Sequence, residues 1–160
     1  MRILAIDPGF ERLGIAVIER DRKTHKEKLI HSECFKTKSS LPFPERLALL
    51  GARVKEVISQ FEPEALAIET LFFTTNQKTA MRVAEARGVI IYEAIRSGLS
   101  IAEFTPLEIK VAITSYGKAD KTQMMRMVRK LIVLAHKTVS DDELDAIAIG
   151  LTYFARGGGK

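Results

Sequence analysis

The chain has 160 residues, of which 46% are apolar and 28% are charged, and its formal net charge is +5. This length suits one domain with a substantial core, and the ordinary apolar content excludes an intrinsically disordered chain. The single cysteine, Cys34, excludes an internal disulfide, as is typical of an intracellular protein, and we expect it to be a small buried hydrophobic residue. No apolar run approaches the roughly 20 residues of a membrane span, so we expect a soluble, cytoplasmic protein without a membrane partner.

The first part of the chain predicts three consecutive strands. Residues 1–6 form an apolar run with β-type side chains, which stops at the turn tripeptide Asp7-Pro8-Gly9. Residues 14–18 and 28–35 predict the second and third strands, and the charged residues 20–28 predict the tip of a hairpin between them. The first buried strand therefore ends at a carboxylate.

Helices and strands alternate in the rest of the chain. Apolar residues recur at helical spacing between Pro44 and Pro63, and the short apolar run at residues 65–68 predicts a buried central strand. The later predicted elements are a helix over 75–95, a strand over 100–104, a short helix from Pro106, and helices over 121–134 and 141–154. Strands that alternate with helices need parallel crossovers, so we expect an α/β fold with a mixed sheet that carries helices on its faces.

Two glycine-containing segments carry further expectations. In the helix over 75–95, the small residues Ala84, Ala86 and Gly88 predict close packing against the sheet. Residues 156–160 include three consecutive glycines and are expected to form a flexible tail. Residues 1–155 then form a single domain.

Four acidic residues stand at the ends of predicted buried elements. Asp7 follows the first strand, Glu69 follows the fourth, and Asp142 and Asp145 lie three residues apart on one face of the last helix. If the first and fourth strands are neighbours, Asp7 and Glu69 emerge at the same sheet edge. Such a cluster cannot stay ionised without cations. Oxygen ligands of this kind suit Mg²⁺ or Mn²⁺, and two such ions can clamp a phosphoryl displacement.

Each acidic residue also has a purely structural interpretation. Asp7 fits the turn tripeptide, and Glu69 fits a solvated strand end. Acidic residues at the start of the last helix stabilise it through the helix dipole, by about 0.3–1 kcal/mol each. Asp145 is harder to explain in this way, because an unpaired carboxylate on its apolar helix face would be unfavourable. Asp141 and Asp145 also share a helix face, so either Asp141 or Asp142 could be the third metal-binding carboxylate beside Asp7 and Glu69.

The positive charge is concentrated in one stretch of the chain. Residues 105–137 carry seven Lys or Arg and two Asp or Glu, and residues 138–160 carry more acidic than basic residues. Clustered cations of this kind bind a phosphate backbone, so the stretch predicts a phosphate-binding surface beside the carboxylates. Its basic residues include Lys110, Lys118, Lys121, Arg126, Arg129 and Lys130.

Five short strings, in the same order, resemble those of the RuvC family of Holliday junction resolvases. They are Ile6-Asp7-Pro8-Gly9 with Gly14, Ala67-Ile68-Glu69, Ala84-Glu85-Ala86-Arg87-Gly88, Tyr116-Gly117-Lys118-Ala119-Asp120-Lys121, and Asp142-Glu143-Leu144-Asp145-Ala146-Ile147-Ala148-Ile149. The resemblance spans the chain from Met1 to about Phe154. Leu144 is bulkier than the usual family residue, Asp141 adds a carboxylate, and residues 136–140 fit the pattern poorly.

The resemblance implies a ribonuclease H-like fold with a central mixed five-stranded sheet flanked by helices. It implies a homodimeric endonuclease that nicks two like strands of four-way junction DNA and leaves ligatable 5′-phosphate and 3′-hydroxyl ends. Mg²⁺ is the implied cofactor, with Mn²⁺ as a substitute and two ions in each site. A branch-migration motor of RuvA- and RuvB-like proteins is an implied partner.

The resemblance also assigns roles to individual residues. The catalytic and metal-binding carboxylates of the family match Asp7, Glu69, Asp142 and Asp145. Lysines that act in junction binding or cleavage match Lys110 and Lys121. A cation in the first turn of a helix is disfavoured by the helix dipole, which independently favours a functional role for Lys121 beside the phosphate.

Two adjacent aromatic residues, Phe72 and Phe73, follow Glu69. Neighbouring side chains of an extended segment point to opposite sides, so one of the two is expected to be exposed. An exposed ring can stack on an unpaired base, which suits opening a junction centre, and the resemblance places the family's aromatic wedge at Phe72. Packing in the core or at a dimer interface is the alternative. The expected DNA-binding residues are Phe72, Phe73, Lys110, Lys118 and Arg126.

Two other classes of protein are alternatives. One is a related nuclease that acts on RNA, such as the YqgF-like ribosomal RNA processing family. Asp7-Pro8-Gly9, in which that family would have an aromatic in the middle, and the string Ala86-Arg87-Gly88 stand against it. The other is a non-catalytic module that binds nucleic acid or ATP on the same fold. An ATP site predicts glycine-rich phosphate loops, and a catalytically dead module would lack a carboxylate.

Overall fold

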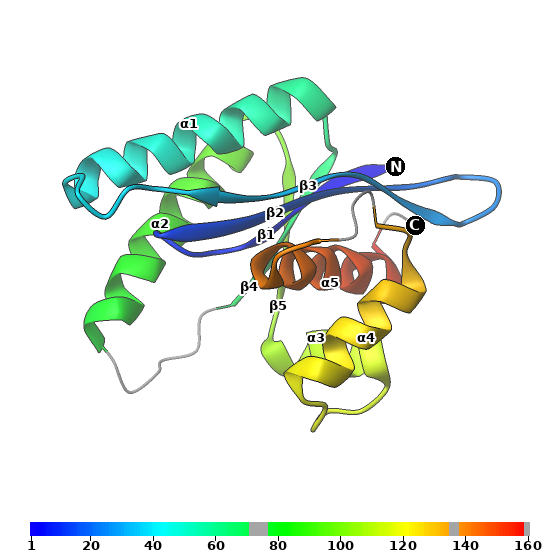
Figure 1. Cartoon of the computed structure of the whole chain (residues 1–160). Coiled ribbons are helices and arrows are strands. Elements are labelled where there is room, and N and C mark those ends of the chain that lie inside the picture. Colours follow the sequence, from blue (N-terminus) through cyan, green and yellow to red (C-terminus); the bar gives the residue numbers. More distant parts are fainter. Residues whose placement is uncertain (71–76, 135–137, 159–160) are drawn as a thin grey trace.

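The computed structural model describes residues 1–70, 77–134 and 138–158. A five-stranded sheet at its centre has the strand order β3-β2-β1-β4-β5. The strands are β1 (Arg2–Asp7), β2 (Arg12–Arg20), β3 (Glu27–Lys36), β4 (Ala65–Glu69) and β5 (Ser100–Phe104). The helices are α1 (Phe43–Phe61), α2 (Gln77–Arg96), α3 (Pro106–Thr114), α4 (Lys121–Leu131) and α5 (Asp141–Ala155). The predicted α/β arrangement, a sheet flanked by helices, is confirmed (Figure 1).

The sheet is mixed, as predicted. β1 pairs antiparallel with β2, and β2 pairs antiparallel with β3. β1 pairs parallel with β4, and β4 pairs parallel with β5. Ile6 lies opposite Ile68 in the parallel pair, so Asp7 and Glu69 leave the sheet side by side at one edge. The first and fourth strands are therefore the neighbours that a shared carboxylate site requires.

Each face of the sheet has its own core and its own helices (Figure 1). Leu4, Ile6, Leu66 and Ile68 point to the face that α1 and α2 cover. Successive side chains of a strand point to opposite faces, so the odd-numbered residues of β1 and β4 face the other side, with α3, α4 and α5. Asp7 and Glu69 are odd-numbered as well, which directs both carboxylates toward α5.

Small residues bring α5 close to the sheet. The strand residues beneath it include Ala5, Ala16, Ala65 and Ala67, all fully buried. On α5 itself, a Cβ atom at Gly150 would lie 2.7 Å from Cδ1 of Ile18 and 3.1 Å from Cβ of Ala5. Only glycine fits there, so the helix that carries Asp142 and Asp145 is fixed directly against the strands that end at Asp7 and Glu69.

Side-chain capping fixes where the last three helices begin. Thr105 with Glu108, Asp120 with Gln123, and Ser140 with Glu143 each form a capping box at the start of α3, α4 and α5. In each pair, the cap oxygen accepts from the third backbone N–H, and the third side chain accepts from the cap N–H. Lys121 and Asp141 are therefore the first residues of α4 and α5, as predicted.

Several predicted boundaries are wrong. β2 and β3 extend further than predicted, because an ion pair of 2.6 Å between Arg20 and Glu27 holds the two strands together close to the hairpin tip. The helix predicted to reach residue 134 ends at Leu131. Ile132 has an extended backbone and a buried side chain, so packing of this β-branched residue overrides continuation of the helix.

The predicted packing of α2 through small residues is only partly correct. Ala86 is buried, but Ala84 and Gly88 are exposed, and a Cβ at Gly88 would meet no atom within 4 Å. The two exposed residues lie one helical turn apart on the side of α2 that faces away from the sheet. Close approach occurs instead at Gly51 of α1, where a Cβ would lie 3.0 Å from Cγ1 of Val89.

Some expectations concern residues outside the described ranges. Phe72 and Phe73 are among them, as is the start of the helix predicted from residue 75. Within the described ranges, no helix is both long and apolar enough to cross a membrane.

Candidate active site

Three of the four predicted carboxylates line one pocket. Asp7 from β1, Glu69 from β4 and Asp145 from α5 surround a cavity of about 270 Å³. Its remaining lining residues are Pro106, Ile109, Lys110, Ala119, Asp120, Lys121, Met124, Ala148 and Ile149. Acidic groups and two lysines therefore meet at a cavity whose walls are otherwise largely apolar.

The pKa of Asp7 lies close to neutral pH, well above that of an ordinary aspartate. The pKa of Asp7 is raised from 3.8 to about 7, mainly by burial and in addition by the negative charges of Asp145, Glu69 and Asp142. The positive charge of Lys121 acts in the opposite direction. The site thus disfavours a charged Asp7 unless further positive charge enters it.

Glu69 behaves in the same way on the neighbouring strand. The pKa of Glu69 is raised from 4.5 to about 7, mainly by burial and in addition by the charge of Asp145, while Lys110 acts to lower it. Arg87 of α2 fixes the backbone here, because its Nε donates to the carbonyl oxygen of Glu69 at 3.1 Å and its guanidinium pairs with Glu103 of β5. The end of β4 is therefore tied to α2 and β5.

Lys121 lies between the acidic residues of α5. Its Nζ is 3.1 Å from Oδ2 of Asp141 and 3.9 Å from Oδ2 of Asp145. Burial raises the pKa of Asp145, Lys121 opposes that rise, and the charges of Asp141 and Asp142 add to it. Asp141 is thus engaged on the outer, exposed side of the site, where it holds the lysine rather than lining the pocket.

Asp142 has a different environment from the other three carboxylates. Its Oδ2 accepts hydrogen bonds from Arg12 Nε at 2.8 Å and Arg12 Nη2 at 2.5 Å, and from Cys34 Sγ at 3.5 Å. Burial acts to raise the pKa of Asp142, but the hydrogen bonds and charge of Arg12 outweigh burial and hold the pKa below its usual value. Cys34 is only half-buried and has a polar contact, so the expectation of a buried hydrophobic residue is wrong.

Gly14 explains why the start of α5 can approach Asp7. It lies opposite Asp7 in the antiparallel pair of β1 and β2. A Cβ on Gly14 would lie 2.1 Å from the carbonyl oxygen of Asp142 and 3.2 Å from Cβ of Asp7. The missing side chain leaves room for the backbone of Asp142, which is thereby fixed beside Asp7.

The donor set fits a hard divalent cation. Asp7, Glu69 and Asp145 offer only carboxylate oxygens, which Mg²⁺ and Mn²⁺ prefer. A cation would also lower the raised pKa values of Asp7 and Glu69 and favour their charged forms. Within the described parts of the chain, no three His, Cys, Asp or Glu side chains are already arranged to hold a metal ion. Loading would therefore require side-chain movement, above all at Asp142.

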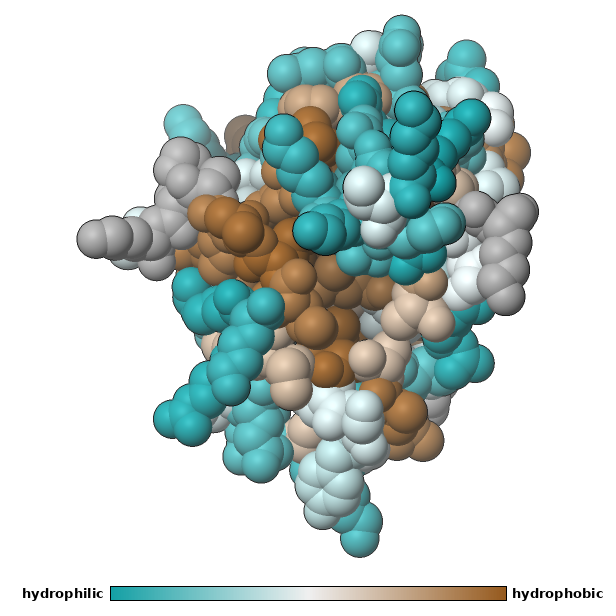
Figure 2. Space-filling view, turned by 90° about the vertical axis from the view of Figure 1, so that its right-hand side faces the viewer, coloured by the Kyte–Doolittle hydropathy of each residue, from teal (hydrophilic) through white to brown (hydrophobic). Residues whose placement is uncertain are grey.

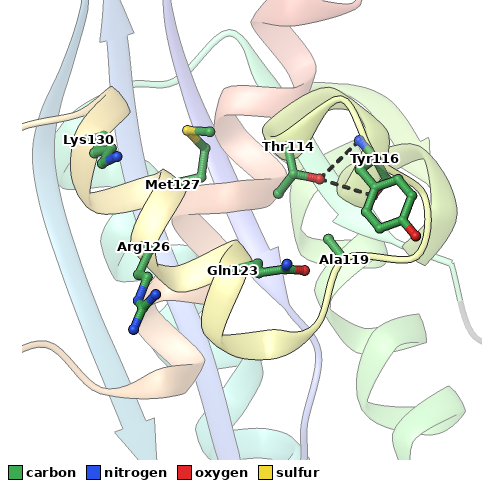
Figure 3. Close-up of a pocket in the computed structure, with 7 residues that line it drawn as sticks. All are labelled: Thr114, Tyr116, Ala119, Gln123, Arg126, Met127 and Lys130. Carbon is green, nitrogen blue, oxygen red and sulfur yellow. Dashed lines mark hydrogen bonds between the residues drawn. The ribbon is translucent and has the colours of Figure 1, made fainter.

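The predicted DNA-binding residues lie in three different places. Lys110 lines the carboxylate pocket, and Lys118 is exposed in the loop between α3 and α4. Arg126 lines a second cavity, of about 280 Å³, between the end of α3 and α4 (Figure 3). This cavity has an apolar side chain, Met127, and a second basic one, Lys130, among its lining residues.

The stretch over residues 105–137 is not a continuous basic surface. Among its described residues, Leu107, Val111, Leu131 and Val133 are exposed apolar side chains that interrupt the lysines and arginines. Figure 2 shows a face of the molecule on which an apolar hollow adjoins hydrophilic areas. The cations are therefore grouped in patches, one at the carboxylate pocket and one along α4.

Sequence reasoning missed Arg12 and the polar role of Cys34. Strand register would have indicated both, because Asp7, Gly14 and Cys34 lie in one row across β1, β2 and β3. Arg12 is two residues from Gly14, so its side chain leaves the same face of β2. Pairing the three strands in antiparallel register through Gly14 would thus have placed Arg12 and Cys34 on the same part of the sheet as Asp7.

Comparisons with known proteins agree with this arrangement. A sequence model of the family described as "Crossover junction endodeoxyribonuclease RuvC" matches residues 3–153. The protein of that name from Caldicellulosiruptor saccharolyticus is 43% identical over 153 residues, which cover 96% of this chain and 92% of the relative. The one from Moorella thermoacetica is 40% identical over 96% of this chain and 90% of the relative.

A solved structure supports the same relationship. The structure described as "T. thermophilus RuvC in complex with Holliday junction substrate" has a TM-score of 0.90 and 33% identity, and the match covers 99% of this chain and 95% of that one. The expected ribonuclease H-like fold is thereby confirmed. Because the family model and these relatives match nearly the whole length, the chain belongs to the RuvC family of crossover junction endodeoxyribonucleases.

Proposed function

We propose that this chain is a metal-dependent endonuclease that resolves four-way DNA junctions by symmetric nicking of two like strands. The observation that carries the proposal is the pocket in which Asp7, Glu69 and Asp145 meet beside Lys110 and Lys121. Carboxylates that can hold cations, next to lysines, suit a phosphodiester substrate. The T. thermophilus relative, whose structure was solved with a Holliday junction substrate, supports a junction as the substrate here.

The proposed cofactor is Mg²⁺, with Mn²⁺ as a substitute and two ions in each site. Asp7, Glu69, Asp142 and Asp145 are the proposed ligands. When bound, the ions supply Lewis-acid activation of water and stabilisation of the leaving oxygen. Asp142 is favoured over Asp141 as the third ligand, because its charge acts on Asp7, whereas Asp141 holds Lys121.

The proposed reaction is hydrolysis of one phosphodiester bond in each of two strands. Water attacks the phosphorus in line with the 3′ oxygen, the P–O3′ bond breaks, and the products are a 5′-phosphate and a 3′-hydroxyl. The hydrogen bond to Asp141 raises the pKa of Lys121, which keeps its ammonium charged. That ammonium can offset the negative charge that develops on the phosphate.

DNA contacts beyond the pocket are proposed at the remaining basic and aromatic residues. Lys118 and Arg126 are exposed on the side of α3 and α4, where they can contact phosphates of the junction arms. Phe72 and Phe73 lie outside the described residues, and their role in stacking on bases at the junction centre remains a prediction. Contacts of both kinds would add to the affinity without taking part in the reaction.

A homodimer would supply one pocket for each of the two strands. Met81, Tyr92 and Ile95 of α2 have exposed fractions of 65%, 58% and 57% and lie along one face of the helix. Gly88 lies on the same face with open space beside it. We therefore place a second copy of this chain against α2, where the glycine would let another helix approach. A partnership with RuvA- and RuvB-like motor proteins remains a prediction from the family.

The experiment that tests this function compares three substrates of matched length. A synthetic four-way junction, a linear DNA duplex and a structured RNA are incubated with the purified chain and Mg²⁺. The proposal expects paired cuts in like strands of the junction, sealed by ligase, and little cutting of the others. Preferential cutting of the RNA would favour the alternative nuclease class, and a chain that binds all three without cutting would favour a non-catalytic module.

A further inference from the structure

The carboxylate of Asp142 is bound by residues that lie outside the pocket. Both hydrogen bonds from Arg12 end on the same atom, Oδ2, and the thiol of Cys34 is directed to that atom as well. The other three carboxylates line the pocket, and Asp142 does not. The side chain is therefore turned toward β2 and β3, although its backbone is fixed beside Asp7.

The fold dictates this contact. Gly14 lets the first turn of α5 lie against β2, and Arg12 projects from the same face of β2 two residues away. The side chain of Asp142 is only 23% exposed, whereas that of Arg12 is 49% exposed. The carboxylate is thus confined at the protein surface with one solvent-accessible cation as its partner, and the described contacts of the Arg12 side chain are limited to Asp142 and Cys34.

An oxygen that accepts three hydrogen bonds is not free to bind a metal ion with the same lone pairs. These bonds occupy Oδ2 and hold the whole carboxylate on the side of Arg12 and Cys34, outside the pocket that Asp7, Glu69 and Asp145 line. Turning the Asp142 side chain into that pocket breaks them. The guanidinium also lowers the local negative potential that attracts a divalent cation. Arg12 therefore competes with the metal ion for one ligand.

We infer that Arg12 is a positioning residue that holds Asp142 outside the carboxylate pocket and that a divalent cation must displace it from Asp142 on loading. The inference rests on the proposed function, because it takes Asp142 as a metal ligand. Arg12 thus sets how tightly the protein binds its metal ions before DNA arrives. An anionic DNA backbone near the pocket would offer the released guanidinium a new partner.

Metal binding in the absence of DNA tests this inference directly. The dissociation constant for Mn²⁺ is measured by calorimetry, and the EPR signal of free Mn²⁺ provides a check. Arg12→Gln should bind Mn²⁺ about two- to fivefold more tightly than the unaltered chain, the range expected from releasing one partly exposed ion pair. Arg12→Lys keeps the charge but loses the paired N–H groups, so it should give a smaller effect in the same direction.

Removal of a positive charge could raise cation affinity without any role for Asp142, so a matched control is needed. Lys36 lies directly opposite Arg12 in the pairing of β2 and β3 and is exposed. Lys36→Gln removes the same charge from the same part of the sheet. It should change the dissociation constant by less than Arg12→Gln does, and an equal change would overturn the inference.

A double-mutant cycle separates this inference from the proposed function. In an Asp142→Asn background, Arg12→Gln should change Mn²⁺ affinity no more than Lys36→Gln does. A full effect of Arg12→Gln in that background would overturn the role of Arg12, even if Asp142→Asn by itself weakens binding. Unchanged Mn²⁺ affinity in Asp142→Asn alone would instead overturn the ligand assignment within the proposed function. Circular dichroism of each variant verifies that the chain is folded, and Arg12→Lys replaces Arg12→Gln if the latter unfolds.

Discussion

Asp7 and Glu69 are half-buried carboxyl groups at the ends of two neighbouring strands. Burial is the main reason why the pKa of each is about 7, and the charge of Asp145 adds to it in both. Their charged forms become favourable when a cation enters the pocket. With Asp7 and Glu69 as the proposed metal ligands, proton release and metal binding would be coupled at these two residues.

This coupling predicts how stability depends on pH when no metal is present. Between about pH 4 and pH 7 the folded chain keeps protons on Asp7 and Glu69 that the unfolded chain has released. The free energy of unfolding should therefore be highest at the acidic end of this range and should fall as pH rises through about 7. Urea unfolding in the presence of EDTA, at several pH values, measures the slope.

Asp7→Asn provides the control for that slope. The amide cannot titrate, so the variant should lose less stability over the same pH range and should be more stable than the unaltered chain above about pH 7. A free energy of unfolding that rises with pH in the unaltered chain, or identical slopes in the two proteins, would contradict the assignment of the protons.

Lys121 offers a second prediction at the scale of one residue. Lys121→Gln should lower the rate of junction cleavage about 100-fold, because one donor to the developing charge is lost. Junction binding should change much less, since many other cations contribute to it. Single-turnover cleavage and a binding titration separate the two effects. Lys118→Gln, in an exposed loop, should change mainly the salt dependence of binding, and equal rate losses in both variants would argue against a role at the phosphate.

At the scale of elements, the contact between β2 and the start of α5 controls the geometry of the site. A methyl group at Gly14 would lie 2.1 Å from the carbonyl oxygen of Asp142, so the helix would have to shift. We expect Gly14→Ala to lower the free energy of unfolding by about 1–3 kcal/mol, as overpacking does. It should also weaken Mn²⁺ binding, because Asp142 moves with the helix.

Gly88→Ala is the matched control for this prediction. Its Cβ would meet no atom of its own chain within 4 Å, and alanine favours helix over glycine, so the variant should be more stable by about 0.5–1 kcal/mol when both proteins are compared as monomers, in the Tyr92→Glu background. Urea unfolding and calorimetry with Mn²⁺ are measured for both variants. Gly14→Ala with unaltered stability and metal affinity would show that the contact does not position the site.

The order of the elements is predictable from the sequence, because hydrophobic periodicity and proline positions mark each helix and strand. The closeness of Asp7 to Glu69 is also predictable, because both residues end strands that pair in parallel. The end of α4 is not predictable in this way, since burial of Ile132 overrides helical continuation. Nor is the rotamer of Asp142 predictable, because it depends on Arg12, which is 130 positions away in the sequence.

At the scale of the whole molecule, the described cations of residues 105–137 are grouped mainly at the carboxylate pocket and on the side of α4. The apolar face of α2 lies on the opposite side of the sheet from both. A second copy bound through α2 would therefore leave both carboxylate pockets uncovered. Such an arrangement suits a substrate with four arms, since each pocket can reach one strand.

This arrangement predicts that a charge on α2 separates the copies. Tyr92→Glu should shift the sedimentation coefficient at micromolar concentrations from that of a dimer to that of a monomer, because a carboxylate would be buried at the contact. Paired cutting of the junction should become single nicking. Val133→Glu, at an apolar residue that is 88% exposed on another part of the surface, should leave the sedimentation coefficient unchanged. If Tyr92→Glu remains a dimer, or if both variants dissociate into monomers to the same extent, the contact between the copies lies elsewhere.

The central claim is that the carboxylate pocket cuts junction DNA with the help of metal ions. Its most direct test incubates the unaltered chain and Asp7→Asn with a synthetic four-way junction and Mg²⁺, and measures binding and cleavage in the same reactions. We expect the unaltered chain to cut two like strands, and Asp7→Asn to bind the junction with similar affinity but not cut it, because a metal ligand is lost while the basic surface is kept. Cleavage retained by Asp7→Asn, or equal cutting of a linear duplex by the unaltered chain, would contradict the claim.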